Sequence, residues 1–160
     1  TRKLAESKFH LLFYAVKKTK KLDLDQQCES NETGIHLQYS IARIEGIKKY
    51  LESDHTFIES DKCVSKSDLD ALFEQFPKSS VLFDMLENFE EKLLQSIFEP
   101  SLLVSYASSL SKLISSLYYH LRIKGEDVDT QKVRWFLFEK SFAILSTILN
   151  LFHVEPVKKI

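Results

Sequence analysis

Glycine and proline are scarce in this chain. Its 160 residues include only 3 Gly and 3 Pro, whereas hydrophobic residues make up 44% of the sequence. Because glycine and proline are the residues that most weaken helices, their scarcity favours long helices within one domain of ordinary size. The hydrophobic fraction is large enough for a core that needs neither disulfides nor metals.

Cysteine and long apolar runs are scarce as well. Cys28 and Cys63 lie in polar stretches and form no CxxC pair, so we predict two free thiols, with a disulfide between them as the alternative. No apolar run reaches the roughly 18 residues that a membrane span needs, and no signal-peptide pattern is present. We therefore expect a cytoplasmic protein without a membrane partner. Thr1 is not a natural initiator, which indicates a segment of a longer chain.

Neither sign of charge dominates. The sequence has 22 Lys and Arg against 23 Asp and Glu, a net charge of −1. This balance argues against a uniformly basic nucleic-acid binder, although a local basic patch remains compatible with it. The basic residues do cluster, at Lys17, Lys18, Lys20 and Lys21, at Arg43, Lys48 and Lys49, at Arg122, Lys124, Lys132 and Arg134, and at Lys158 and Lys159. Solvated helix ends are the alternative explanation.

The common catalytic patterns are missing. Three scattered glycines cannot form a phosphate-binding loop, and the sequence contains no HExxH motif, no His/Cys/Asp cluster with metal-ligand spacing and no GxSxG elbow. The five histidines are dispersed. We therefore predict no catalytic residue, metal, cofactor or small-molecule substrate in this chain.

Hydrophobic periodicity predicts a sequence of helices. Residues 3–17 have helical spacing, with a strand as the alternative, and residues 18–33 resemble a linker. Leu37, Ile41, Ile44 and Leu51 then form one face of a helix that begins after Gly34 and ends near Ser53.

Caps and breakers divide the remaining sequence into four more helices. We predict a short helix near 67–75 with Ser65 or Ser67 as its cap, a helix capped by Ser79 or Ser80 that extends to Ile97, a helix from Pro100 to Gly125, and one from about Thr130 to His153. The last has a wide apolar face, which is typical of the central helix of a bundle. The fold class is therefore all-α, an antiparallel bundle of about five to six helices.

Two segments combine aromatic and basic side chains. His36, Tyr39 and Arg43 are spaced by one helical turn, and Tyr118, Tyr119 and His120 precede Arg122 and Lys124. Unpaired RNA bases bind to such mixtures by stacking and by phosphate contacts. Ordinary packing is the alternative, including an ion pair between Arg43 and Glu45.

Residues 33–44, TGIHLQYSIARI, resemble the arginyl-tRNA synthetase signature TGPYLQYAHARI. Upstream, Ala5, Lys8, Phe9 and Leu12 are similar to that family's AVKYADL segment. Downstream, residues 99–118 resemble its EPHRLATYLYDLASAFHSFY segment without a gap, Arg122-Ile123 falls where the family has Arg-Val, and residues 134–160 are similar to its C-terminal pattern. The resemblance is to the DALR anticodon-binding domain, and it covers nearly the whole chain.

The resemblance implies a helical bundle, residues 34–160, which binds the anticodon arm of an arginine tRNA, preceded by a helix and linker at 1–33. It assigns tRNA-contacting roles to His36, Tyr39, Tyr118, Arg122, Ile123 and Ile160. Arg43, Lys124, Lys158 and Lys159 join this set as neighbouring cations, the last two beside the C-terminal carboxylate, which they would neutralise.

Several positions depart from the family pattern. Ile35, His36, Tyr119, His153 and Ile160 stand where the family has Pro, Tyr, Asn, Gly and Met. These departures favour a synthetase-like accessory protein that delivers arginine tRNA to a methyltransferase making 3-methylcytidine. An arginyl-tRNA synthetase that performs arginyl-tRNA aminoacylation is the alternative, and a protein-interaction bundle that has lost RNA binding is the second.

Overall fold

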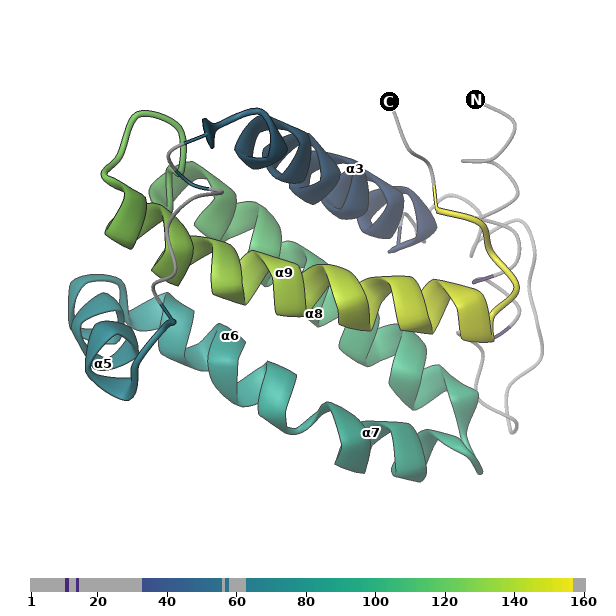
Figure 1. The fold of residues 1–160 in the computed structure, drawn as a ribbon. Coiled ribbons are helices and arrows are strands. Elements are labelled where there is room, and N and C mark those ends of the chain that lie inside the picture. The colour runs from purple at the N-terminus through teal and green to yellow at the C-terminus, as the bar shows by residue number, and fades with distance from the viewer. Residues whose placement is uncertain (1–10, 12–13, 15–32, 56, 58–62, 157–160) are drawn as a thin grey trace.

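The computed structural model describes residues 11, 14, 33–55, 57 and 63–156 (Figure 1). Within this part of the chain, six helices and no strand are defined, which confirms the predicted all-α class. They are α3 (Thr33–Glu52), α5 (Lys66–Gln75), α6 (Pro77–Glu87), α7 (Phe89–Ser96), α8 (Pro100–His120) and α9 (Val128–Leu151). Except for Leu11 and Tyr14, the predicted helix at 3–17 lies outside the described residues, as do the linker after it, Cys28 and the last four residues.

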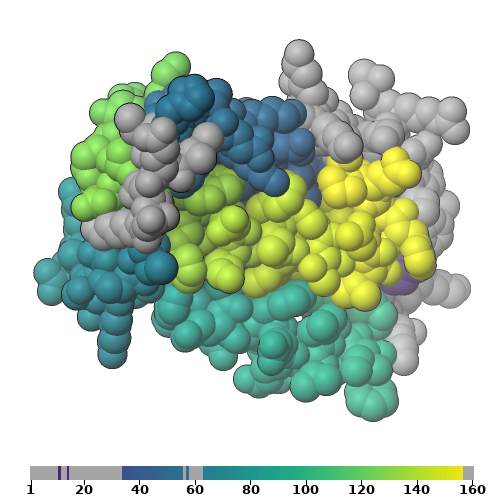
Figure 2. Space-filling model, viewed as in Figure 1, coloured from purple at the N-terminus to yellow at the C-terminus, as the bar shows by residue number. Residues whose placement is uncertain are grey.

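Helix α9 is central to the bundle, as its wide apolar face predicts. It contacts α3, α5, α6 and α8, and Figures 1 and 2 show it passing between α3 on one side and α6 and α7 on the other. Leu137, Phe138 and Leu145 are completely buried along it. Leu151, in the last turn of the helix, is by contrast 50% exposed.

The predicted face of α3 is confirmed. Leu37, Ile41, Ile44 and Leu51 are at most 2% exposed. Short polar side chains let α3 approach α8 closely: the hydroxyls of Ser40 and Ser111 are buried and hydrogen-bonded at 3.0 Å. This contact sets the spacing between the two helices that carry the aromatic and basic segments.

The prediction for residues 77–97 was wrong in two respects. The helix begins at Pro77 rather than after Ser79 or Ser80, since proline is well accommodated in a first turn. The two serines are not caps: the Ser79 hydroxyl donates to the carbonyl of Phe76 at 2.6 Å, and that of Ser80 donates to Pro77 at 2.8 Å. In addition, the helix is interrupted at Asn88, which separates α6 from α7. By contrast, Ser65 caps α5 as predicted.

Two further boundaries differ from the prediction. Helix α8 ends at His120 rather than at Gly125, which lies in the following turn with a φ of 87°. Helix α9 begins at Val128, because Asp127 is its cap: Oδ1 accepts a hydrogen bond from the Thr130 N–H at 2.9 Å. The hydrogen bonds with Thr130 also lower the pKa of the Asp127 carboxyl.

The backbone at the end of α9 explains why the family has glycine at position 153. His153 has a φ of 54°, in the left-handed region that favours glycine, and glycine is the family residue at this position. The Val154 N–H donates to the carbonyl of Leu149 at 2.9 Å, and the His153 N–H donates to that of Asn150 at 3.0 Å. This is the Schellman arrangement that ends many helices, so the backbone keeps its shape although the glycine is replaced.

Candidate nucleic-acid interface

Arg43 on α3 lies among three tyrosines. Its guanidinium carbon is 4.1 Å from the ring centre of Tyr39, 4.7 Å from that of Tyr118 and 5.1 Å from that of Tyr119. The Arg43 Nη2 atom also donates hydrogen bonds to the hydroxyls of Tyr39, at 2.6 Å, and Tyr119, at 2.8 Å. We name these four residues the tyrosine–arginine cluster. It joins two segments that are about 75 positions apart in the sequence.

This arrangement replaces the ion pair that we considered for Arg43. Glu45 pairs instead with Lys49, at 3.5 Å. Partial burial by itself lowers the pKa of the Arg43 guanidinium, but the hydrogen bond to Tyr119 and the phenolic groups of Tyr39 and Tyr119 raise it, and the net shift is upward. Arg43 is therefore a permanent cation, held in place by aromatic rings on several sides.

The cluster leaves aromatic surface accessible. Tyr39 is 40% exposed and Tyr119 is 65% exposed, whereas Tyr118 is half-buried and makes an edge contact with the core residue Phe138. A ring that is fixed by a neighbouring cation yet open on one side is suited to stacking an unpaired base, because little conformational entropy is lost on binding.

A cavity of about 570 Å³ adjoins the cluster, between α3 and the chain that follows α8. Its lining consists of Gly46, Ile47, Tyr50, Tyr118, Tyr119, Leu121, Arg122, Ile123 and Lys124. The Lys124 ammonium nitrogen lies 5.7 Å from the ring centre of Tyr50, and both residues line the cavity. The cavity is large enough for a nucleobase, and it offers both apolar walls and cations.

Residues 121–124 leave the helix in an alternating pattern. Leu121 and Ile123 are 1% and 4% exposed, while Arg122 and Lys124 between and after them are exposed. Successive side chains of an extended chain point to opposite sides, which produces this alternation of buried and exposed residues. It explains why α8 ends early: the core gains two apolar side chains, and both cations are directed to the surface beside the cavity.

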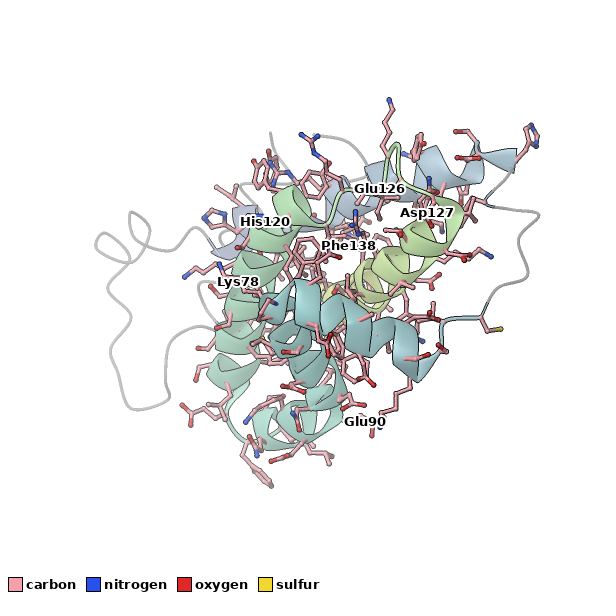
Figure 3. All side chains as sticks on the ribbon, turned by 90° about the vertical axis from the view of Figure 1, so that its left-hand side faces the viewer. Lys78, Glu90, His120, Glu126, Asp127 and Phe138 are labelled. Carbon is pink, nitrogen blue, oxygen red and sulfur yellow. The ribbon has the colours of Figure 1, made fainter. Side chains whose placement is uncertain are left out.

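A buried arginine fixes this extended segment. Arg134 on α9 is 6% exposed; its Nη1 donates to the carbonyl of Arg122 and lies 3.1 Å from the Glu126 carboxylate. Gln131, also on α9, donates to the carbonyl of Glu126 at 2.8 Å. In Figure 3 Glu126 lies at the same end of the bundle as His120, the last residue of α8.

The structure brings together six of the residues proposed from the sequence. Tyr39, Arg43 and Tyr118 belong to the tyrosine–arginine cluster, and Arg122, Ile123 and Lys124 line the cavity. His36 is exposed on α3, one helical turn before Tyr39. Lys158, Lys159 and Ile160 lie outside the described residues, although the chain just before them is held near α3, where Gln38 donates to the carbonyl of Glu155 at 2.9 Å.

Five residues of this surface were not in the predicted set: Gly46, Ile47, Tyr50, Tyr119 and Leu121. Tyr119 was named in the aromatic and basic segment and as a departure from the family, but not as a contact residue. Gly46 and Tyr50 lie one and two helical turns beyond Arg43, so a longer α3 face would have indicated them. Gly46 is unusual, since glycine weakens a helix interior and an added Cβ there would meet nothing within 4 Å.

Neither a metal-binding cluster nor a membrane-spanning helix is found in the described part of the chain. Among the described residues, no group of three or more His, Cys, Asp and Glu could hold a metal ion. No helix in this part of the chain has the length and apolar character to cross a bilayer.

Comparison with known families matches residues 37–160 to the DALR anticodon binding domain. The chain belongs to the DALR anticodon-binding domain family. The match extends from the first core residue of α3 to the end of the chain, so the DALR domain contains both the tyrosine–arginine cluster and the cavity.

Curated relatives of this DALR domain are arginine–tRNA ligases. The probable mitochondrial arginine–tRNA ligases of Pongo abelii and Homo sapiens are each 29% identical over 128 residues, which is 79% of this chain and 20% of theirs. The arginine–tRNA ligase of Ruminiclostridium cellulolyticum is 26% identical over 134 residues, which is 82% of this chain and 23% of its own. The chain thus spans about a fifth of the length of these relatives. No solved structure matches it significantly.

Proposed function

We propose that this DALR domain binds the anticodon arm of an arginine tRNA through the tyrosine–arginine cluster and the adjoining cavity. The observation that carries the proposal is the position of Arg43, fixed among three tyrosines beside a cavity of about 570 Å³. Protein recognition of RNA sequence uses loop bases that leave the stack and place their faces on aromatic side chains. The anticodon loop is the part of a tRNA that presents such bases.

Each part of the surface has a role in this proposal. Tyr39 and Tyr119 offer exposed ring faces for stacking, and the cavity receives a base edge. Arg122 and Lys124 are exposed at the cavity and contact phosphates. Arg43 uses Nη2 for both tyrosine hydroxyls, so its Nη1 hydrogens are directed to the RNA. His36, Lys158, Lys159 and Ile160 complete the proposed contact set.

We propose two contexts for this DALR domain. Its similarity to arginine–tRNA ligases supports a ligase in which this domain, residues 34–160, follows the segment 1–33 and holds the anticodon arm. The replaced family residues His36, Tyr119 and His153 support an accessory factor that brings arginine tRNA to a 3-methylcytidine methyltransferase. The relatives include mitochondrial proteins, so a mitochondrial location stands beside the cytoplasmic one that we expected.

Assays on the full-length protein separate these contexts. A ligase charges arginine tRNA with arginine in the presence of ATP. An accessory factor leaves the tRNA uncharged but increases the rate at which a methyltransferase forms 3-methylcytidine. The domain has the same role in either protein, so the binding test below does not depend on which context holds.

A fluorescence anisotropy titration at low salt tests the binding. We expect arginine tRNA to bind more tightly than an unrelated tRNA, and Tyr39→Ala and Arg122→Ala to weaken that binding. Matched controls are Phe98→Ala, an aromatic residue 78% exposed beyond α7, and Lys112→Ala, an exposed cation on α8. The salt dependence should be shallow, because few phosphates are neutralised by so few cations. Equal binding of both tRNAs, with both substitutions silent, would leave a protein-interaction bundle as the remaining function.

A further inference from the structure

A second surface lies on α6, α7 and the first turn of α8, and it is acidic where the tyrosine–arginine cluster is basic. Five large apolar residues are exposed there: Val81, Leu94, Ile97, Phe98 and Leu102, with exposed fractions between 40% for Leu102 and 78% for Phe98. Isolated exposed apolar residues are common on proteins, but a group of this kind within one stretch of 22 residues marks a contact surface.

Part of this surface is a groove of about 540 Å³ between α6, α7 and α8. Met85 and Tyr106 are among its lining residues, and Val81 and Leu102 line it from opposite helices. Its base is rigid, because the Tyr106 hydroxyl donates to the carbonyl of Met85 at 2.8 Å and the Tyr106 ring lies 5.9 Å from that of Phe89. The groove therefore keeps its shape without an occupant.

Leu94, Ile97 and Phe98 extend the groove at its α7 end. They follow one another at helical spacing, and their chain neighbours connect them to the groove: Gln95, next to Leu94, is one of its lining residues. Leu102, four residues after Phe98, is another. These three exposed side chains are therefore adjacent in sequence to residues that line the groove.

The charge around the groove is strongly acidic. Residues 81–102 contain five carboxylates, Asp84, Glu87, Glu90, Glu91 and Glu99, and one lysine, Lys92. Asp84, Glu91 and Lys92 line the groove itself, so two of its three charged lining residues are acidic. The Lys92 ammonium donates to the Gln95 amide oxygen at 3.1 Å. We name residues 81–102 with their groove the apolar–acidic face.

This composition determines the kind of partner. Clustered carboxylates repel RNA phosphates and anionic lipid headgroups, so neither a nucleic acid nor an anionic membrane suits the face. An apolar groove with an acidic rim is complementary to an amphipathic helix that has an apolar stripe and basic flanks. The groove takes the apolar side chains at i, i+3, i+4 and i+7, and the rim pairs with Lys and Arg.

We propose that the apolar–acidic face docks a basic amphipathic helix of a partner protein. The face lies away from the tyrosine–arginine cluster: Figure 1 shows α7 and α3 on opposite sides of α9, and in Figure 3 Glu90 lies far from His120. A partner helix and a tRNA therefore bind the domain at the same time. The proposal does not depend on the tRNA function, since it uses none of the same residues.

The test uses the full 160-residue chain and a labelled synthetic peptide. The peptide is an amphipathic helix of about 18 residues, five turns, with leucines on one stripe and lysines elsewhere. A peptide of identical composition with the leucines distributed around the helix is the control for charge alone. We expect the amphipathic peptide to bind about tenfold more tightly than its isomer, because only the stripe fits the groove.

Matched variants locate the binding. The double variant Ile97→Ser, Phe98→Ser should weaken peptide binding about tenfold or more, whereas Leu151→Ser, a leucine 50% exposed on α9, should change it less than about twofold. Asp84→Lys should also weaken binding, and Glu139→Lys on α9 should not. All five positions are exposed, so the fold should persist in each variant, which circular dichroism will verify.

Three results would overturn the proposal. Equal affinity for the two peptides would mean attraction by charge alone. Binding that survives the Ile97→Ser, Phe98→Ser change would place the peptide elsewhere. Self-association of the chain in sedimentation equilibrium, abolished by the same double variant, would mean that a second copy occupies the face. Unchanged peptide affinity in the presence of saturating arginine tRNA supports two separate sites, and competition between them contradicts this arrangement.

Discussion

The tyrosine–arginine cluster and the apolar–acidic face differ in the sign of the charge that accompanies their exposed apolar and aromatic side chains. In the first, aromatic rings surround a cation, and Arg122 and Lys124 add positive charge. In the second, exposed apolar residues stand among five carboxylates and one lysine. The net charge of −1 for the whole chain therefore does not describe either surface.

This difference shows that the net charge of a chain is a poor guide to the charge of any one of its surfaces. A near-neutral chain appeared unsuited to nucleic acid, yet contacts depend on local charge within a Debye length of roughly 10 Å. A single chain can thus offer one surface to a polyanion and another to a basic partner. Four substitutions test whether the two surfaces are as distinct as we describe, from the largest expected effect to the smallest.

Arg43→Ala should have the largest effect, on RNA binding. Removal of the guanidinium releases three tyrosine rings, and base stacking on aromatic residues contributes about 1–3 kcal/mol per base. We expect arginine tRNA to bind about ten- to a hundredfold more weakly in an anisotropy titration. Arg43→Lys should restore the charge but little of the affinity, because an ammonium cannot bond both hydroxyls in the same geometry. Full recovery of the tRNA affinity with lysine would mean that the cluster contributes only the positive charge at position 43.

Arg134→Met should destabilise the fold by about 2 kcal/mol, a typical value for lost hydrogen bonds to a charged group. Methionine keeps most of the apolar stem but removes the donors to the Arg122 carbonyl and the Glu126 carboxylate. Urea unfolding measures the loss. Arginine tRNA binding should weaken as well, although Arg134 is buried, while peptide binding at the apolar–acidic face should remain unchanged. An equal loss at both faces would indicate general unfolding.

Tyr106→Phe tests, through the pH dependence of stability, how the base of the groove in the apolar–acidic face is held. Burial raises the pKa of the Tyr106 phenol to about 12. Because this pKa exceeds the unfolded value of about 10, the neutral phenol stabilises the fold fully below pH 10, and the contribution is lost as pH rises towards 12. We expect the variant to be about 1 kcal/mol less stable at neutral pH, because it lacks the hydrogen bond to Met85, and to lose stability less steeply between pH 10 and 12. Identical alkaline slopes for both proteins would show that the phenol ionises as readily as in the unfolded chain.

Gly46→Ala should have the smallest effect and the opposite sign. Alanine favours a helix interior by about 0.5–1 kcal/mol over glycine, and an added Cβ at position 46 meets nothing within 4 Å. Thermal unfolding should therefore shift upward. Gly46→Leu keeps this helix preference but fills the cavity, so it should weaken tRNA binding while the domain remains folded. Tight tRNA binding by Gly46→Leu would mean that no base enters the cavity.

Helical periodicity predicted α3, α5, α8 and α9 because each buries one stripe of apolar residues. It could not place the interruption at Asn88, since the apolar spacing continues from α6 into α7. It also missed the end of α8, where Leu121 and Ile123 alternate with cations over only four residues, too few for a strand pattern to be recognised. The family's glycine at position 153 is explained by the structure, because the backbone there has a positive φ.

The candidate site was predictable in its residues but not in its geometry. Tyr39, Arg43 and Tyr118 were proposed from aromatic and basic neighbours and from the family resemblance. Their convergence on one guanidinium depends on the close contact of Ser40 with Ser111, which no local pattern reveals. The cavity likewise requires two segments distant in the sequence, and the exposure of the apolar residues at 81–102 depends on which helix faces the fold covers.

Hydrogen exchange with and without the anticodon stem-loop of an arginine tRNA tests the central claim most directly. If the stem-loop binds where we propose, amides of residues 36–50 and 118–124 should be protected, while those of residues 81–102 should exchange at an unchanged rate. A stem-loop with an altered anticodon should give weaker protection of the same segments. Protection confined to residues 81–102, or none at all at a saturating stem-loop concentration, would contradict the assignment of the tyrosine–arginine cluster to tRNA.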